Sequence, residues 1–112
     1  MTHRNLNVID ATERAADRVN QLIERRSSYR LLHVNQLRAS VQSIGANIAE
    51  GFGRGPGRDR IRYLRIARGE AEETIQHLRT NYRAKRIAPK EYWSLHNLLV
   101  VIVKMLDSLV HH

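Results

Sequence analysis

The stretch Ser43-Ile44-Gly45-Ala46-Asn47-Ile48-Ala49-Glu50-Gly51-Phe52-Gly53-Arg54 contains the end of one predicted helix and the start of a glycine-rich turn. Ile44 and Ile48 are four residues apart, so they share one face of that helix. Ser43, Asn47, Glu50 and Arg54 follow the spacing i, i+4, i+7 and i+11 and form a polar stripe beside that face. Gly51 and Gly53 favour a helix that ends in left-handed backbone, followed by a turn that extends to Gly57.

The segments on both sides of this turn have helical spacing. Before the turn, apolar residues alternate in steps of three and four at Val34, Leu37, Val41, Ile44 and Ile48. After the turn, the pattern is repeated at Ile61, Leu64, Ala71, Ile75, Leu78 and Tyr82. The same periodicity predicts a helix at each end of the chain, the last one beginning at Pro89, because proline is favoured in the first turn.

These segments predict an all-α protein with one domain over residues 1–112. The expected helices cover about residues 7–26, 29–50, 58–86 and 89–110. Because short connections separate them, consecutive helices are expected to run in opposite directions. The sequence therefore predicts an antiparallel up-and-down four-helix bundle.

The last expected helix has apolar side chains around its whole circumference. Six consecutive apolar residues from Leu98 to Val103 cannot fit on one helical face. In a small protein, such a helix is expected to be buried by another subunit. The second helix, with Arg38 as its only charged residue between Leu31 and Ala49, also indicates packing on more than one side. We expect a homo-oligomer with Leu98, Val101, Ile102 and Met105 at the subunit interface.

The composition is strongly basic. Of 112 residues, 19 are Lys or Arg and 11 are Asp or Glu, which gives a formal net charge of +8, mostly from arginine. Arginine forms paired hydrogen bonds with phosphates and carboxylates, which suits nucleic acid or an acidic protein surface, although an arginine-rich coding bias would give the same excess. The chain has no cysteine, begins with polar residues and has only short apolar runs, so a cytoplasmic protein without membrane contact is expected.

Six arginines are concentrated around the glycine turn and are opposed only by Asp59: Arg54, Arg58, Arg60, Arg62, Arg65 and Arg68. Positive charge is unfavourable at a helix N-terminus, so this cluster needs a compensating partner. One explanation is an ion pair between Glu50 and Arg58 or Arg62. The other is bound nucleic-acid phosphate, held by a ring of these arginines in an oligomer. The two are compatible, since Glu50 cannot neutralise six arginines.

The polar residues of the second helix do not indicate an enzyme. Ser43 has neither a histidine base nor the glycine-flanked turn of a catalytic serine in its sequence neighbourhood. The stripe is more typical of hydrogen bonds between helices that fix their register, and its members are Gln36, Ser40, Ser43, Asn47 and Glu50. Within it, we interpret Ser43, Asn47 and Glu50 as a structural polar motif. The histidines lack metal-ligand spacing and the turn lacks a Walker A lysine, so no metal or cofactor is expected.

The stretch from Ser43 to Arg54 resembles the central motif of the bacterial four helix bundle protein family, also called the 23S rRNA intervening-sequence protein family. The stretch Tyr63-Leu64-Arg65-Ile66-Ala67-Arg68-Gly69-Glu70-Ala71-Glu72-Glu73 resembles its second signature. The resemblance implies a closed homopentamer with a central opening. It also makes Asn47 and Glu50 signature residues without an established catalytic role. The sequence departs from the family at Gly45, where proline is usual, and at Arg65 and Arg68, where apolar or small residues are frequent.

The additional arginines make the chain distantly similar to the basic accessory proteins of diversity-generating retroelements. Those proteins bind a reverse transcriptase and nucleic acid. The sequence and the resemblance together predict a non-enzymatic, oligomeric accessory protein that binds nucleic acid, with RNA as the expected ligand, through the six arginines. The alternative is a protein-interaction scaffold, such as an accessory subunit of a reverse transcriptase.

Overall fold

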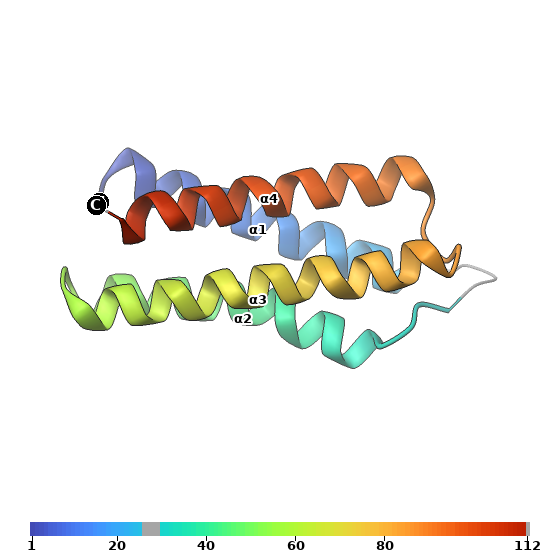
Figure 1. Ribbon diagram of the computed structural model, residues 1–112, viewed down its shortest axis with the longest axis horizontal. Coiled ribbons are helices and arrows are strands. Elements are labelled where there is room, and N and C mark those ends of the chain that lie inside the picture. Colours follow the sequence, from blue (N-terminus) through green and yellow to red (C-terminus); the bar gives the residue numbers. More distant parts are fainter. Residues whose placement is uncertain (26–29, 112) are drawn as a thin grey trace.

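The computed structural model describes residues 1–25 and 30–111, and in this part of the chain it contains four α-helices and no β-strand. The helices are α1 (His3–Glu24), α2 (Val34–Gly53), α3 (Arg58–Arg83) and α4 (Pro89–Val110). They lie side by side along the long axis of a molecule that measures 47 × 22 × 18 Å (Figure 1). The prediction of an all-α fold is confirmed.

One apolar face from each helix contributes to a common core. α1 packs against α2 and α4, and α3 packs against the same two helices, with the most extensive contact between α2 and α3. The fully buried side chains include Val19 of α1, Ile44 of α2, Leu78 of α3 and Leu99 of α4. Burial of one such side chain stabilises a fold by about 1.5–3 kcal/mol, so this core is the main reason that the helices are stable.

Local interactions explain where the first two helices begin. α1 begins at His3, earlier than expected, because the side chain of Thr2 accepts a hydrogen bond of 3.1 Å from the backbone N–H of Asn5. α2 begins only at Val34. The amide side chain of the buried Asn81 holds the backbone of Leu32, accepting from its N–H at 2.6 Å and donating to its carbonyl at 3.1 Å. The expected end of the first helix at residue 26 and start of the second at residue 29 lie outside the described residues.

The ends of α2 and α3 also differ from the expected ranges. α3 ends at Arg83, just before Lys85 adopts a left-handed φ of 59°, whereas α4 has the expected range. The helical part of α2 continues to Gly53, and the glycines with positive φ are Gly55 at 73° and Gly57 at 133°. The prediction that the helix ends in left-handed backbone at Gly51 and Gly53 was therefore wrong.

Gly51 instead allows α2 and α3 to approach closely. It is buried, and a Cβ atom at this position would lie 3.2 Å from the backbone oxygen of Arg60 and 3.2 Å from Cβ of Tyr63. These separations are shorter than ordinary van der Waals contacts. Gly51 thus sets the distance between the two helices that carry the arginine cluster.

The expected interface residues on α4 divide into two groups. Ile102 lies on the face shared by Leu95, Leu99 and Leu106 and is 0% exposed within its own chain, so its assignment to a subunit interface was wrong. Val101 is 43% exposed, and Leu98 and Met105 are half-buried. By length and composition alone, α4 could cross a membrane, a property that it shares with the core helices of many proteins.

Candidate nucleic-acid interface

The six arginines predicted to bind nucleic acid lie where the chain passes from α2 into α3, at one end of the long axis (Figure 1). Arg54 follows the last residue of α2, and the other five occupy the first turns of α3. The first residue of α3 is Arg58, and its N-cap residue Gly57 makes no side-chain hydrogen bond to the helix. These six arginines differ in the contacts that each makes within the chain.

Arg60 is used to hold α2 and α3 together. Its Nε donates to the carbonyl of Gly51 at 3.3 Å, and its Nη2 donates to the carbonyl of Phe52 at 3.2 Å. Its guanidinium also lies 5.3 Å from the centre of the Phe52 ring. The last carbonyls of a helix lack partners within the helix and favour a positive charge, so Arg60 stabilises the end of α2. We therefore remove Arg60 from the predicted contacts with nucleic acid.

Arg54 lies within a group of polar side chains. Its guanidinium is 3.7 Å from the carboxylate of Glu50 and 3.7 Å from that of Asp59, and it donates to the Tyr63 hydroxyl at 3.2 Å. Glu50 precedes Arg54 by one helical turn, and this local pair replaces the expected pair with Arg58 or Arg62. The expectation of an ion pair from Glu50 to α3 was wrong.

Tyr63 belongs to this group, although the sequence analysis did not assign it. The guanidinium of Arg62 lies 4.6 Å from the centre of the Tyr63 ring, and that of Arg54 lies 5.2 Å from it. Both distances are within the range of cation–π attraction. Arg62 also reaches the carboxylate of Asp59 at 3.7 Å. Arg62 and Tyr63 are neighbours in the sequence, and this adjacency could have indicated the contact between their side chains.

Arg68 has its partner on a different helix. Its Nε lies 2.6 Å from the carboxylate of Asp107 on α4, and its Nη1 lies 3.4 Å from Glu72 on α3. An arginine in an otherwise apolar seam invites a partner, and the partner here is internal. Arg68 consequently links α3 to α4 and has little remaining capacity for phosphate.

Arg58 and Arg65 form no ion pair with any described residue, and both are exposed. With Arg62 they follow the spacing i, i+4 and i+7, so the three side chains share one face of α3. We call Arg58, Arg62 and Arg65 the arginine face. Among the described residues, Asp59 is the one carboxylate that pairs with any of them, so the face retains an excess of positive charge.

The polar motif of α2 is satisfied within its own helix. Asn47 donates through Nδ2 to the Ser43 carbonyl at 2.8 Å and to the Ser43 hydroxyl at 3.0 Å. The hydrogen bond between helices occurs earlier in the stripe, where the buried hydroxyls of Ser40 and Thr74 are 2.8 Å apart. The prediction of bonds between helices is thus confirmed for Ser40 and was wrong for Ser43 and Asn47.

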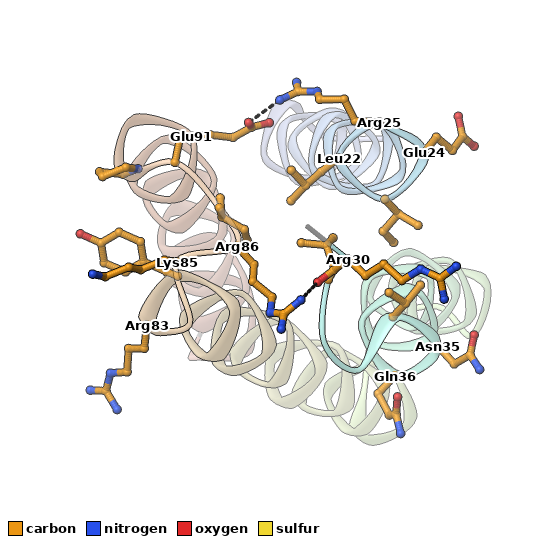
Figure 2. A pocket seen from close by; sticks show the side chains of 17 residues that line it. Leu22, Glu24, Arg25, Arg30, Asn35, Gln36, Arg83, Lys85, Arg86 and Glu91 are labelled. Carbon is orange, nitrogen blue, oxygen red and sulfur yellow. Dashed lines mark hydrogen bonds and ion pairs between the residues drawn. The ribbon is translucent and has the colours of Figure 1, made fainter. Parts of the chain in front are cut away.

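A second basic region lies at the opposite end of the molecule. An opening of about 1290 Å³ is found where α1 and α3 end and α2 and α4 begin. Figure 2 shows Arg86 pointing into this opening, with Arg83 and Lys85 directed away from it. Arg86 donates through Nη1 to the Arg30 carbonyl at 2.6 Å. This region was not predicted from the sequence, although residues 79–90 contain five cationic residues and no carboxylate.

Neither end of the molecule has the features of a metal site. Among the residues that the structure describes, no three His, Cys, Asp or Glu side chains are grouped closely enough to hold a metal ion. His33 and His77 approach with their ring centres 6.1 Å apart, and His77 lies 3.5 Å from the Glu73 carboxylate. This arrangement supplies fewer ligands than a structural zinc site requires.

Comparison with known proteins agrees with this helical architecture. The family model for 23S rRNA-intervening sequence proteins matches residues 4–108, and the chain therefore belongs to this family. The chain is also similar to the crystal structure of a protein of unknown function from the S23 ribosomal protein family of Bacteroides thetaiotaomicron. The two chains are 29% identical, with a TM-score of 0.87 over 97% of this chain and 99% of the other. No protein with curated annotation matches the chain.

Proposed function

We propose that this protein is a non-enzymatic accessory protein that binds nucleic acid, with RNA as the expected ligand, through the arginine face. The observation that carries this proposal is the exposure of Arg58 and Arg65, which lack internal carboxylate partners among the described residues, beside Arg62. Exposed guanidiniums on one helical face can contact successive phosphates of one strand. The name of the family supports RNA, since it refers to an intervening sequence of 23S rRNA.

We further propose that the four helices form an antiparallel up-and-down bundle. Three contacts between α1 and α4 support this arrangement. Arg4 bonds to Ser108, Arg18 donates to Ser94 at 2.8 Å, and Arg25 reaches Glu91 at 2.5 Å. Residues early in α1 thus meet residues late in α4, and residues late in α1 meet residues early in α4, as antiparallel neighbours require.

The assembly proposed for this bundle is a cytoplasmic homopentameric ring. The support is the outer side of α4, where Leu98, Val101 and Met105 remain partly accessible in the single chain. Coverage of these side chains by a second copy would remove apolar surface from water. A ring would also repeat the arginine face around its axis and present several such faces to one RNA.

The alternative function is a protein-interaction scaffold, such as an accessory subunit of a reverse transcriptase. The observation that favours it is Trp93, which is 49% exposed and packs edge-on against Tyr92 with ring centres 5.0 Å apart. Exposed aromatic residues are enriched at the centres of protein–protein interfaces. Retention of a protein partner after nuclease treatment and loss of that partner in Trp93→Ala would favour the scaffold.

The experiment that tests RNA binding compares two triple variants by fluorescence anisotropy with a labelled single-stranded RNA. The first variant changes Arg58, Arg62 and Arg65 to alanine. The control changes Arg14, Arg79 and Lys104 to alanine, because these three residues are exposed, lie outside the arginine face and carry the same total charge. We expect the first variant to bind at least tenfold more weakly than the control. Equal affinities would contradict the proposal.

A further inference from the structure

The opening at the end opposite the arginine face is lined by both apolar and charged residues. Its apolar lining includes Leu22 of α1, Val34 of α2 and Ile87 between α3 and α4. Tyr82, whose ring stacks on that of Tyr92, is also among the lining residues. Its volume of about 1290 Å³ is far larger than a single inorganic anion needs. The opening can therefore accept a ligand whose body is apolar or planar.

Arg86 provides the polar group in this opening. Its side chain is half-buried, its Nη1 is bonded to the Arg30 carbonyl at 2.6 Å, and its Nε is buried without a hydrogen-bond partner. No described carboxylate pairs with Arg86, and residues 26–29 contain no Asp or Glu. A half-buried guanidinium without a carboxylate partner can accept an anion from a ligand in the opening.

The charges around the opening also favour an anion. The nearby carboxylate of Glu91 is occupied by Arg25 at 2.5 Å. Arg83 and Lys85 point outward, yet they and Arg30 contribute a positive field at the rim, which attracts anions from solution (Figure 2). A multiply charged group such as a phosphate gains more from this field than a single carboxylate does.

We propose that this opening binds a phosphate-bearing ligand with a planar or apolar body, such as a nucleotide, and that Arg86 holds its phosphate. The Arg86 guanidinium makes one hydrogen bond among the described residues, so its other Nη donors suit a phosphate oxygen, and the apolar walls suit a base. The phosphate can come from a free nucleotide or from the 5′ end of a nucleic-acid strand. The proposal does not depend on the arginine face, because the two regions lie at opposite ends of the molecule.

The protein contains its own reporter for this site. Trp93 is the only tryptophan, and its ring centre lies 6.2 Å from that of Tyr82. ATP and pyrophosphate are expected to change the Trp93 fluorescence and to release or absorb heat in calorimetry at low salt. Adenosine, which lacks phosphate, and succinate, which carries carboxylates, are expected to bind at least tenfold more weakly than ATP.

A matched pair of variants on α3 and its end locates the anion. Arg86→Met is expected to weaken ATP and pyrophosphate binding at least tenfold. Arg79→Met, which removes an exposed arginine that does not line the opening, is expected to retain wild-type affinity. If circular dichroism shows that Arg86→Met does not fold, Lys85→Glu provides the test instead. This variant reverses a charge at the rim of the opening and leaves the Arg86 hydrogen bond in place. This variant is expected to lose affinity several-fold.

Two further comparisons identify the source of the phosphate and separate this site from the arginine face. Tighter binding of a short RNA with a 5′ phosphate than of its 5′-hydroxyl counterpart, in the triple alanine variant of the arginine face, would assign the site to a strand end. Equal binding of the two RNAs together with binding of ATP would assign it to a free nucleotide. Absence of any response to ATP and pyrophosphate, or equal affinities of folded Arg86→Met and Arg79→Met, would overturn the proposal.

Discussion

The two ends of this molecule are both rich in positive charge, but they use it differently. Around the α2–α3 turn, Arg54, Arg60 and Arg68 find partners within the chain, and the arginine face is left on the outside of α3. At the opposite end, Arg86 points inward and forms no ion pair with a described carboxylate. The number of arginines in a segment therefore does not tell how many of them are available to a ligand.

The largest effect on stability is expected at the end that contains the opening, where the buried side chain of Asn81 bonds to the backbone of Leu32. Asn81→Leu removes the amide that satisfies both backbone groups of Leu32, and it leaves them without that partner. We expect a loss of about 2–4 kcal/mol in the free energy of unfolding. Urea denaturation measures this loss. Thr80→Ala is the control, since the neighbouring Thr80 is exposed and bonds only to its own helix at Gln76.

The close approach at the arginine end gives the next largest effect. Gly51→Ala places a methyl group 3.2 Å from both Arg60 O and Tyr63 Cβ, so α2 and α3 must move apart. We expect the free energy of unfolding to fall by about 1–3 kcal/mol, despite the higher helix propensity of alanine. Gly53→Ala meets nothing within 4 Å and is expected to leave stability unchanged or raised. Equal thermal midpoints for the two variants would show that the helices can separate at no cost.

A pair of single variants tests which arginines stabilise the fold and which are available to bind RNA. Arg60→Ala removes two hydrogen bonds to the end of α2 and is expected to cost about 1–2 kcal/mol of stability with little change in RNA affinity. Arg58→Ala is expected to leave stability nearly unchanged and to weaken RNA binding about two- to fivefold. The reverse result would exchange the roles that we assign to these two residues.

The smallest effect concerns the acidic side of α3 between the two ends. Burial, together with the neighbouring Glu73 carboxylate, raises the pKa of Glu70 above its ordinary value. The folded protein therefore holds this proton more tightly than the unfolded chain does, so stability falls as the pH rises through the raised pKa. Glu70→Gln should remove that loss and be more stable than wild type at pH 7 by about 0.2–0.5 kcal/mol. Chemical denaturation at pH 4 and pH 7 measures the difference, which should vanish at the lower pH.

Much of the fold could be predicted from the sequence, because apolar periodicity depends mainly on helix geometry. The periodic positions Val41, Ile44 and Ile48 are buried as the spacing indicated. The roles of Gly51 and Ile102 were not predicted. Whether a glycine reverses a chain or admits a neighbouring helix depends on tertiary packing, and so does the choice of which side of an all-apolar helix faces the core.

The location of the candidate site was predicted from the sequence, but which of the six arginines are available to a ligand was not. The arginine cluster was evident from its spacing, whereas the contacts of Arg60 to the α2 carbonyls and of Arg68 to Asp107 depend on distances between helices. The opening around Arg86 combines residues from all four helical ends. Its lining residues are far apart in the sequence, so the cationic run in residues 79–90 does not by itself indicate an opening.

The central claim is that the exposed arginine face contacts nucleic-acid phosphates. The most direct test is the slope of log affinity against log salt concentration for a single-stranded RNA, measured for the wild type and for the triple variant Arg58→Ala, Arg62→Ala, Arg65→Ala. Each lost phosphate contact reduces the steepness of this slope by about 0.7. The account predicts that the triple variant has a slope shallower by about 2. Equal slopes for the two proteins would contradict it.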